Sequence, residues 1–184
     1  GGSEVTPYQD GERIYKFPFA TESISQVGLL SIGQRADASG SSSPANGYTS
    51  GGRISPPYNG TDVIDKFTFA ISSGNATDVG NLLAAAHGYG GSGNSSSTHG
   101  YHVGGGDFPV YTNVIQKFSF SVDGNATDAA DLTANREQFS AVGNTSLTHG
   151  YTAAGYGPTD TAREVIEKFP FSSDTNATDV GDLS

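Results

Sequence analysis

One phrase recurs along the chain and constrains its fold more than any other feature. It reads "VIDKFTF" at 63–69, "VIQKFSF" at 114–120 and "VIEKFPF" at 165–171, with a divergent copy, "RIYKFPF", at 13–19. The lysines of the four copies lie 50, 51 and 51 residues apart. A constant period of this length predicts an array of structural repeats.

A second motif, in which Gly-Tyr is followed by small residues, alternates with the first. It reads "NGYTSGG" at 46–52, "HGYHVGG" at 99–105 and "HGYTAAG" at 149–155. The repeat frame therefore covers nearly the whole chain, and we expect a single repeat domain. Its expected bounds are 1–184, with repeats at approximately 1–50, 51–101 and 102–152 and a partial repeat at 153–184.

Within a repeat the local pattern is that of β-strands. In "VIDKFTF" one face carries Asp65, Phe67 and Phe69, and Ile64 and Lys66 lie on the other. Glycine clusters bound the apolar runs, and no segment keeps a helical period. Each repeat offers about four short strands, the size of one propeller blade. The sequence thus predicts an all-β fold, a β-propeller of four-stranded blades of about 51 residues, with three full repeats plus a half.

Three kinds of residue recur at fixed places, and we expect them to hold the blades together. They are a lysine, the phenylalanine after it and an aspartate on the following strand: Lys16, Lys66, Lys117 and Lys168; Phe67, Phe118 and Phe169; Asp78, Asp128 and Asp179. A lysine stem can lie along a half-buried face while its ammonium reaches the rim. We therefore expect a lysine–aspartate contact inside each blade. The first repeat has Gln26 in place of the aspartate, so the expectation does not extend to it.

The order of these motifs resembles kelch-type β-propeller repeats, in which a glycine doublet closes one strand and an apolar strand with paired aromatics follows a polar loop. Phenylalanine stands where the usual kelch tryptophan would be. The wording, "VIDKF-F" and "NATDVGDL" with "S-STHGY--GG", is similar to kelch-like repeat arrays in structural or tail-associated proteins of marine tailed bacteriophages. That resemblance implies a virion or host-contact role.

The count of motifs leaves the ring incomplete. The lysine phrase occurs four times and the Gly-Tyr motif three times, which gives roughly 14 strands at four per blade. Propellers typically have about four to eight blades, and open sheet edges invite pairing with another chain. The chain could close as a four-bladed ring with one depleted blade, share a larger ring with a second copy, or form a section of a longer chain or fibre. We favour association with other copies.

Composition excludes several classes of protein. The net charge of −10 and the pI near 4.5 argue against nucleic-acid binding, which requires clustered basic residues. No apolar run is long enough for membrane insertion. The absence of cysteine rules out a disulfide framework and the copper radical oxidases among kelch-like proteins, which need a cysteine cross-linked to tyrosine. No signal peptide is visible, and the lack of an initiating Met is expected of a processed or excised product.

No catalytic, metal or cofactor motif is legible, so we expect no enzyme activity and no cofactor. His99 and His149 occupy the same place in consecutive repeats, and Asn46 takes that place in the first. A position that recurs with the repeat indicates a structural side chain bonded to a neighbouring backbone. The alternative is a ligand contact at one mouth of the propeller. His87 and His102 are off this pattern and are expected at the surface.

Two further patterns have structural interpretations. The pairs Asp128 with Asp131 and Asp179 with Asp182 lack the twelve-residue calcium loop, and side-chain turns to the backbone explain them better. Six N-x-S/T sequons would be glycan acceptors in a secreted eukaryotic protein, but in a phage protein they are expected to be turn residues only. These are Asn59, Asn75, Asn94, Asn125, Asn144 and Asn176.

The sequence therefore predicts a non-enzymatic structural and interaction module, virion-associated or extracellular. It would form a homo-oligomer or longer assembly and contact a host-surface protein or glycan through the loops at 33–46, 84–97 and 134–147. The alternative is a carbohydrate-binding propeller that stacks sugars on exposed tyrosines. The repeated candidates are Tyr48, Tyr101 and Tyr151, although packing between blades explains a repeated tyrosine equally well.

Overall fold

The fold is built entirely from β-strands in the part of the chain that the structure describes. The computed structural model describes residues 12–54, 59–70, 72–86, 92–107, 110–137, 146–158 and 162–184. Over these ranges there is no helix, and hence none long and apolar enough to cross a membrane. The predicted all-β class is confirmed.

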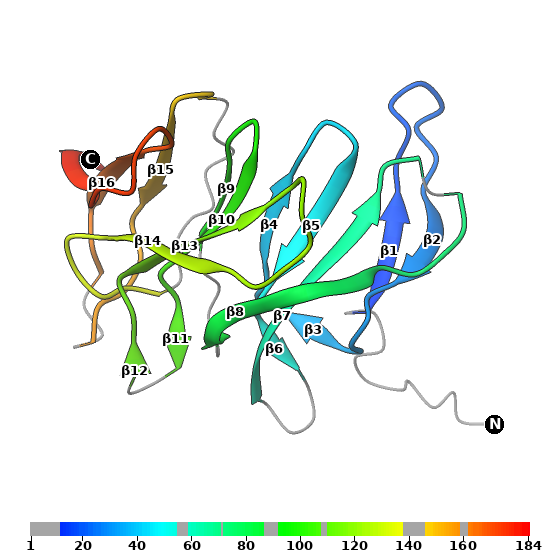
Figure 1. Ribbon diagram of the computed structural model, residues 1–184, viewed down its shortest axis with the longest axis horizontal. Helices are drawn as coiled ribbons and strands as arrows, with labels where there is room; N and C mark the ends of the chain where they lie inside the picture. Colours follow the sequence, from blue (N-terminus) through cyan, green and yellow to red (C-terminus); the bar gives the residue numbers. More distant parts are fainter. Residues whose placement is uncertain are drawn as a thin grey trace.

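The strands group into four consecutive units that stand side by side along the long axis of the molecule (Figure 1). Unit 1 contains β1 (Arg13–Lys16) and β2 (Ser25–Leu29). Unit 2 contains β4 (Ser39–Ser42), β5 (Asn46–Ser50), β7 (Asn59–Thr68) and β8 (Thr77–Ala86). Unit 3 contains β9 (Ser92–Ser95), β10 (His99–Val103), β13 (Val114–Ser119) and β14 (Thr127–Asp131). Unit 4 contains β15 (His149–Ala153), β16 (Val165–Pro170) and β17 (Thr178–Asp182).

Two short ribbons extend units 2 and 3. β3 (Arg35–Ala36) and β6 (Arg53–Ile54) lengthen the β7 end of unit 2, and β11 (Gly106–Asp107) pairs with β12 (Val110–Tyr111) beside unit 3. Units 2 and 3 are antiparallel sheets with the same strand order, β4-β5-β7-β8 and β9-β10-β13-β14. Each sheet therefore combines the end of one sequence repeat with the beginning of the next.

The register of each sheet gives it two different faces. In unit 2, Tyr48 lies opposite Lys66, so both side chains leave on the same side of the sheet, together with Ile64. We call this the forward face. Asp65 and Phe67 alternate with these residues and form the backward face. The same pairing recurs in units 3 and 4, because Tyr101 lies opposite Lys117 and Tyr151 opposite Lys168.

The hydrophobic core lies between the units rather than within them. Each of three clusters joins the forward face of one unit to the backward face of the next. They contain Ile14, Val27, Ala76 and Phe67; Tyr48, Ile64, Leu82, Phe118 and Ala126; and Tyr101, Ile115, Leu132, Phe169 and Ala177. Burial on both faces explains why the strands carry apolar residues at alternate and adjacent positions.

The glycine of the Gly-Tyr motif makes room for the aromatic ring opposite it. Gly100 pairs with Phe118 across β10 and β13, and Gly150 pairs with Phe169 across β15 and β16. The phenyl ring occupies the space that a Cβ would take at either glycine. The glycine thus allows the phenylalanine ring to lie over the backbone of its own sheet. The other side of the ring contacts the neighbouring unit.

Candidate functional site

The "NAT" motif joins each unit to the outer strand of the unit before it. The asparagine Oδ1 accepts a hydrogen bond from a backbone N–H, and the following alanine donates its own N–H to the carbonyl of that same residue. The pairs are Asn75 with Leu29 at 3.2 Å, Asn125 with Asn81 at 3.0 Å and Asn176 with Asp131 at 3.1 Å. Figure 1 shows the turn between β13 and β14 reaching toward unit 2. The expectation that these three sequons are turn residues only is therefore wrong.

The aromatic residues repeat a second contact between units. Tyr48 packs against Phe118 and Phe120, and the ring centroids of Tyr48 and Phe120 are 4.9 Å apart. Tyr101 meets Phe169 and Phe171 in the same arrangement. Tyr48 and Tyr101 are only 2% and 4% exposed, so their rings cannot stack on a sugar. Tyr151, the third predicted contact, is half-buried and has no such aromatic partner among the described residues.

The lysines also reach the next unit, which corrects the predicted contact inside each blade. Lys66 Nζ lies 2.8 Å from Asp123, and Lys117 Nζ lies 2.6 Å from Asp174. The expected partner, Asp78, pairs instead with Asp65 across the sheet and therefore belongs to the opposite face. By register, the equivalent aspartates of units 3 and 4 lie opposite Gln116 and Glu167.

The residue before the lysine is a buried hydrogen-bond acceptor at the junction in units 2, 3 and 4. Its side chain accepts a backbone N–H from the preceding unit, either just after the outer strand (Ser31, Thr133) or within it (Leu83). The pairs are Asp65 with Ser31 at 3.3 Å, Gln116 with Leu83 at 2.7 Å and Glu167 with Thr133 at 2.6 Å. All three acceptor residues are buried. A buried backbone N–H left unpaired is costly, so these side chains fix the approach of neighbouring units.

Buried arginines accompany two of the three acceptors. Arg35 pairs with Asp65 at 3.2 Å, and Arg136 pairs with Glu167, with all four side chains fully buried. Burial lowers the pKa of Arg35, although the charge of Asp65 opposes that shift. At the middle junction the acceptor is the uncharged Gln116, and the facing segment 83–86 carries only leucine and alanine. At each of the three junctions, therefore, a buried arginine and a buried carboxylate acceptor are either both present or both absent.

Sequence reasoning missed these arginines, although a signal was present. Arg35 precedes Asp65 by 30 residues and Arg136 precedes Glu167 by 31, so an arginine occurs only where the next repeat has a carboxylate before its lysine. The period rests on residues that every repeat shares. The paired substitutions differ between repeats and fall outside such a consensus.

The repeated histidines lie in the turns that enter β10 and β15. His99 Nδ1 is 2.8 Å from Thr98 Oγ1, and His149 Nδ1 is 2.9 Å from Thr148 Oγ1. Their backbone N–H groups donate to a serine Oγ three residues earlier. Asn46 makes the same backbone contact in unit 2. In both residues Nδ1 thus bonds the hydroxyl of the preceding threonine, and burial lowers the pKa of His99.

His102 is buried between units 2 and 3, so its predicted surface position is wrong. Its Nδ1 lies 3.1 Å from Ser50 Oγ, and its Nε2 has no hydrogen-bond partner among the described residues. Burial, with a smaller contribution from the charge of Arg35, lowers the pKa of His102 to about 4. The ring is therefore neutral at physiological pH. His87 lies outside the described residues.

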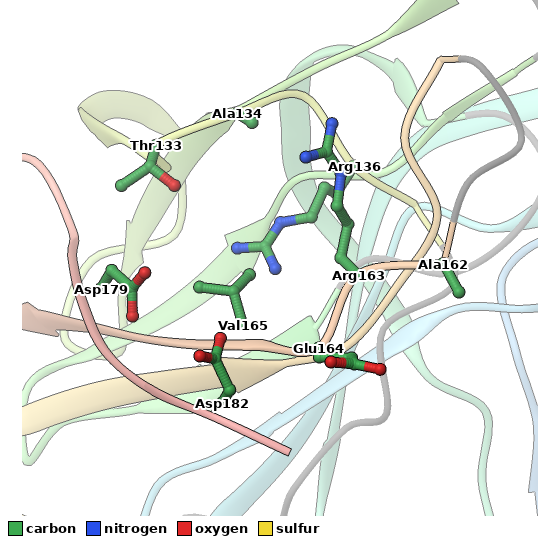
Figure 2. A pocket seen from close by; sticks show the side chains of 9 residues that line it. All are labelled: Thr133, Ala134, Arg136, Ala162, Arg163, Glu164, Val165, Asp179 and Asp182. Carbon is green, nitrogen blue, oxygen red and sulfur yellow. The ribbon is translucent and has the colours of Figure 1, made fainter. Parts of the chain in front are cut away.

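A cleft of about 390 Å³ opens where unit 3 meets unit 4 (Figure 2). Asp179 and Asp182 lie on one side, and Arg136 and Arg163 on the other. Burial, followed by the nearby charge of Arg163, lowers the pKa of Arg136 to about 10, which keeps it protonated at neutral pH. Arg136 is neutralised by its pair with Glu167, so Arg163 is the cation that faces the opening.

The cleft lining contains charged groups but no recognisable catalytic set. One exposed cation, Arg163, stands against the carboxylates of Glu164, Asp179 and Asp182. Asp179 Oδ1 accepts the N–H of Gly181, as the side-chain turn predicted for this aspartate requires. Over the described ranges no three His, Asp or Glu side chains gather in a way that could hold a metal ion. What the cleft can do is bind a ligand by charge.

Replacing Arg136 with alanine leaves Glu167 charged, buried and without its cation. We expect this single change to lower the free energy of unfolding by about 3–5 kcal/mol. The double variant Arg136→Ala, Glu167→Gln reproduces the uncharged middle junction and is expected to recover most of the loss. Urea unfolding of the three proteins measures both effects. A double variant as unstable as the single one would show that the unpaired charge is not the cause.

The lowered pKa of His102 makes stability depend on pH. A histidine in the unfolded chain titrates near pH 6.5, so the unfolded state binds more protons between about pH 4 and 6.5. The free energy of unfolding is therefore unaffected by the titration of His102 above about pH 6.5, and it decreases as the pH falls from there toward 4. His102→Thr, which places the residue of Thr49 and Thr152 here, should flatten this part of the curve. Unfolding free energies of both proteins across this range measure the difference, and equal slopes would contradict it.

Comparison with known proteins bears on the fold alone. No protein-family model matches the sequence, and no curated protein matches it. Solved structures do: 112 chains are similar. One, titled "Structure of YjhT", is a β-propeller-type protein with a TM-score of 0.68 and 11% sequence identity. The match covers 88% of this chain and 56% of that one, so the chain spans little more than half the length of YjhT. The all-β arrangement fits a β-propeller-like fold.

Proposed function

We propose that the chain is a non-enzymatic structural and interaction module, an arc of kelch-like propeller blades that works within a larger assembly. Units 2 and 3 correspond to blades of four strands, and units 1 and 4 to blades with fewer described strands. The likeness to YjhT and the side-by-side arrangement support the propeller interpretation.

The observation that carries this proposal is the directional contact between units. The asparagine contact and the buried acceptor recur at all three junctions, and the lysine and aromatic contacts recur at two of them. Most recurring side chains are used in this way to join units, whereas the two repeated histidines, Asp78 and Asp179 bond residues close to them in sequence. Such an arrangement suits a scaffold that adds units side by side.

The setting and the partner that we propose follow from the resemblance and from the net charge. The resemblance to phage repeat arrays favours a virion-associated or extracellular location, and the net charge of −10 keeps such a surface from binding nucleic acid. A host-surface protein or glycan is the partner we propose for the connections between units. The segments at 33–46, 84–97 and 134–147 differ most between repeats, and parts of the last two lie outside the described residues. They are not loops throughout, because the first contains β3 and β4 and the second contains the end of β8 and β9.

The mass of the purified chain in solution tests the assembly role. We expect light scattering coupled to size exclusion to give about twice 18.9 kDa or more, rising with protein concentration because association follows mass action. A monodisperse monomer at every concentration, with cooperative melting, would contradict an assembly of copies. It would favour a ring that closes within one chain.

A second candidate function is binding of an amino sugar in the cleft between units 3 and 4. The specific observation is the excess of carboxylates over cations around a cavity of about 390 Å³. That volume lies in the range of ligand pockets, and a protonated amine could pair with Asp179 and Asp182 while hydroxyl groups bond the polar lining. We therefore propose this cleft, and not the buried tyrosines, for the carbohydrate alternative.

Calorimetric titration with D-glucosamine tests this second function, with D-glucose as the uncharged control. We expect saturable binding of glucosamine alone, and its loss in the variant Asp179→Asn, Asp182→Asn. Asp128→Asn, which changes the equivalent aspartate of unit 3 outside the cleft, should bind normally. Equal binding of both sugars, or no effect of the cleft variant, would exclude recognition by these carboxylates.

A further inference from the structure

The forward face of unit 4 has side chains equivalent to those with which units 2 and 3 contact the following unit. In unit 4 these side chains are not covered by a following unit. Leu82 and Leu132 are 4% and 3% exposed under the following unit, whereas the equivalent Leu183 is 43% exposed. Tyr151 occupies the place of Tyr48 and Tyr101 in the register. Lys168 has no carboxylate partner among the described residues, although both equivalent lysines have one.

The backbone of the same face is also shaped for a neighbour. A Cβ on Gly80 would collide with Gly124 in the turn of the next unit, and Gly28 meets Gly74 in the same way. The equivalent Gly181 has the same φ of +155° as Gly80 but faces open space. The conformation that admits a neighbouring turn is thus present at unit 4 without the turn.

The opposite end of the molecule shows the complementary half. The backward face of unit 1 carries Phe17 and Phe19, which are 51% and 90% exposed and correspond to the phenylalanine pairs that pack on Tyr48 and Tyr101. Ile24 is also exposed. Glu22 follows Lys16 by six residues, as Asp123 follows Lys117 and Asp174 follows Lys168. Unit 1 therefore offers an aromatic pair and a carboxylate at the places where the internal junctions use them.

We propose that unit 4 of one copy docks onto unit 1 of a second copy, head to tail. This inference rests on the proposed assembly role and names its interface. Phe17 and Phe19 pack on Tyr151, and Glu22 pairs with Lys168, as their counterparts do within the chain. Ile24 covers Leu183, since it takes the place of the alanine that follows the junction asparagine. The partner of unit 4 is thus unit 1 of a second copy, which offers equivalent apolar residues and a carboxylate opposite Lys168.

Unit 1 lacks two of the side chains that make contacts at the junctions within the chain, and this weakens the proposed interface. Ser23 replaces the junction asparagine, and Tyr15, exposed on the backward face, replaces the buried acceptor. Two backbone N–H groups of unit 4 therefore keep water as their partner. The interface should be weaker than the internal junctions and reversible. Because its two halves are different surfaces, successive copies build a ring or an open filament.

Two face variants test the proposal in full-length protein. Phe19→Asp disables unit 1, and Leu183→Asp disables unit 4; both positions are exposed, so each variant should fold, as circular dichroism can verify. Sedimentation equilibrium should show each variant alone to be monomeric, with association weakened about tenfold or more. Val110→Asp, at an exposed position of the β11–β12 hairpin outside both faces, should associate like wild type.

Mixing the two face variants gives the decisive result. Phe19→Asp keeps an intact unit 4 and Leu183→Asp an intact unit 1, so an equimolar mixture should form dimers of about twice 18.9 kDa that grow no further. A mixture that stays monomeric, or face variants that assemble like wild type, overturns the head-to-tail interface while leaving the assembly role standing. A wild type that is monomeric at all concentrations overturns both.

Discussion

The structure depends on the alternation of side chains along one strand type. In "V-I-x-K-F-x-F" the isoleucine and lysine point to one neighbouring unit, while the residue between them and the phenylalanines point to the other. Because successive side chains of a β-strand point to opposite faces, one motif supplies residues to both of the junctions that a unit makes. Repeating the phrase every 50 or 51 residues then places a forward face against a backward face each time. The core forms between units as a consequence, and no unit can bury its apolar residues alone.

Polar groups decide how closely the units approach. The outer strand of a sheet has backbone N–H groups that its own sheet cannot pair, and side chains of the following unit accept them. The buried charges at the outer two junctions add a condition. Arg35 meets Asp65 and Arg136 meets Glu167, but Gln116 meets no cation. Removal of either arginine would leave its carboxylate buried without a cation, so each arginine and its carboxylate must be retained together.

The sequence predicted the class, the period and the recurring residues, because all three follow from strand periodicity and self-similarity. It did not predict which neighbour each residue would meet. The recurrence of an aspartate on the following strand predicts that Lys66 meets Asp78 inside its own blade, yet register puts the two on opposite faces. Its glycine-rich surroundings predict a surface position for His102, but the contact between units buries it beside Ser50. A repeated motif shows which residues of different repeats are equivalent. Which residues contact each other depends on how the sheets are arranged in space.

The central claim is that side chains of one unit hold the outer-strand amides of the unit before it, and amide hydrogen exchange tests it most directly. The amides of Leu29, Asn81 and Asp131 are bonded to Asn75, Asn125 and Asn176 rather than within their own sheets. They should exchange slowly, with protection similar to that of the amides paired inside the same strands. Exchange of these three amides at the rate of exposed edge amides, with the inner strands still protected, would contradict the account.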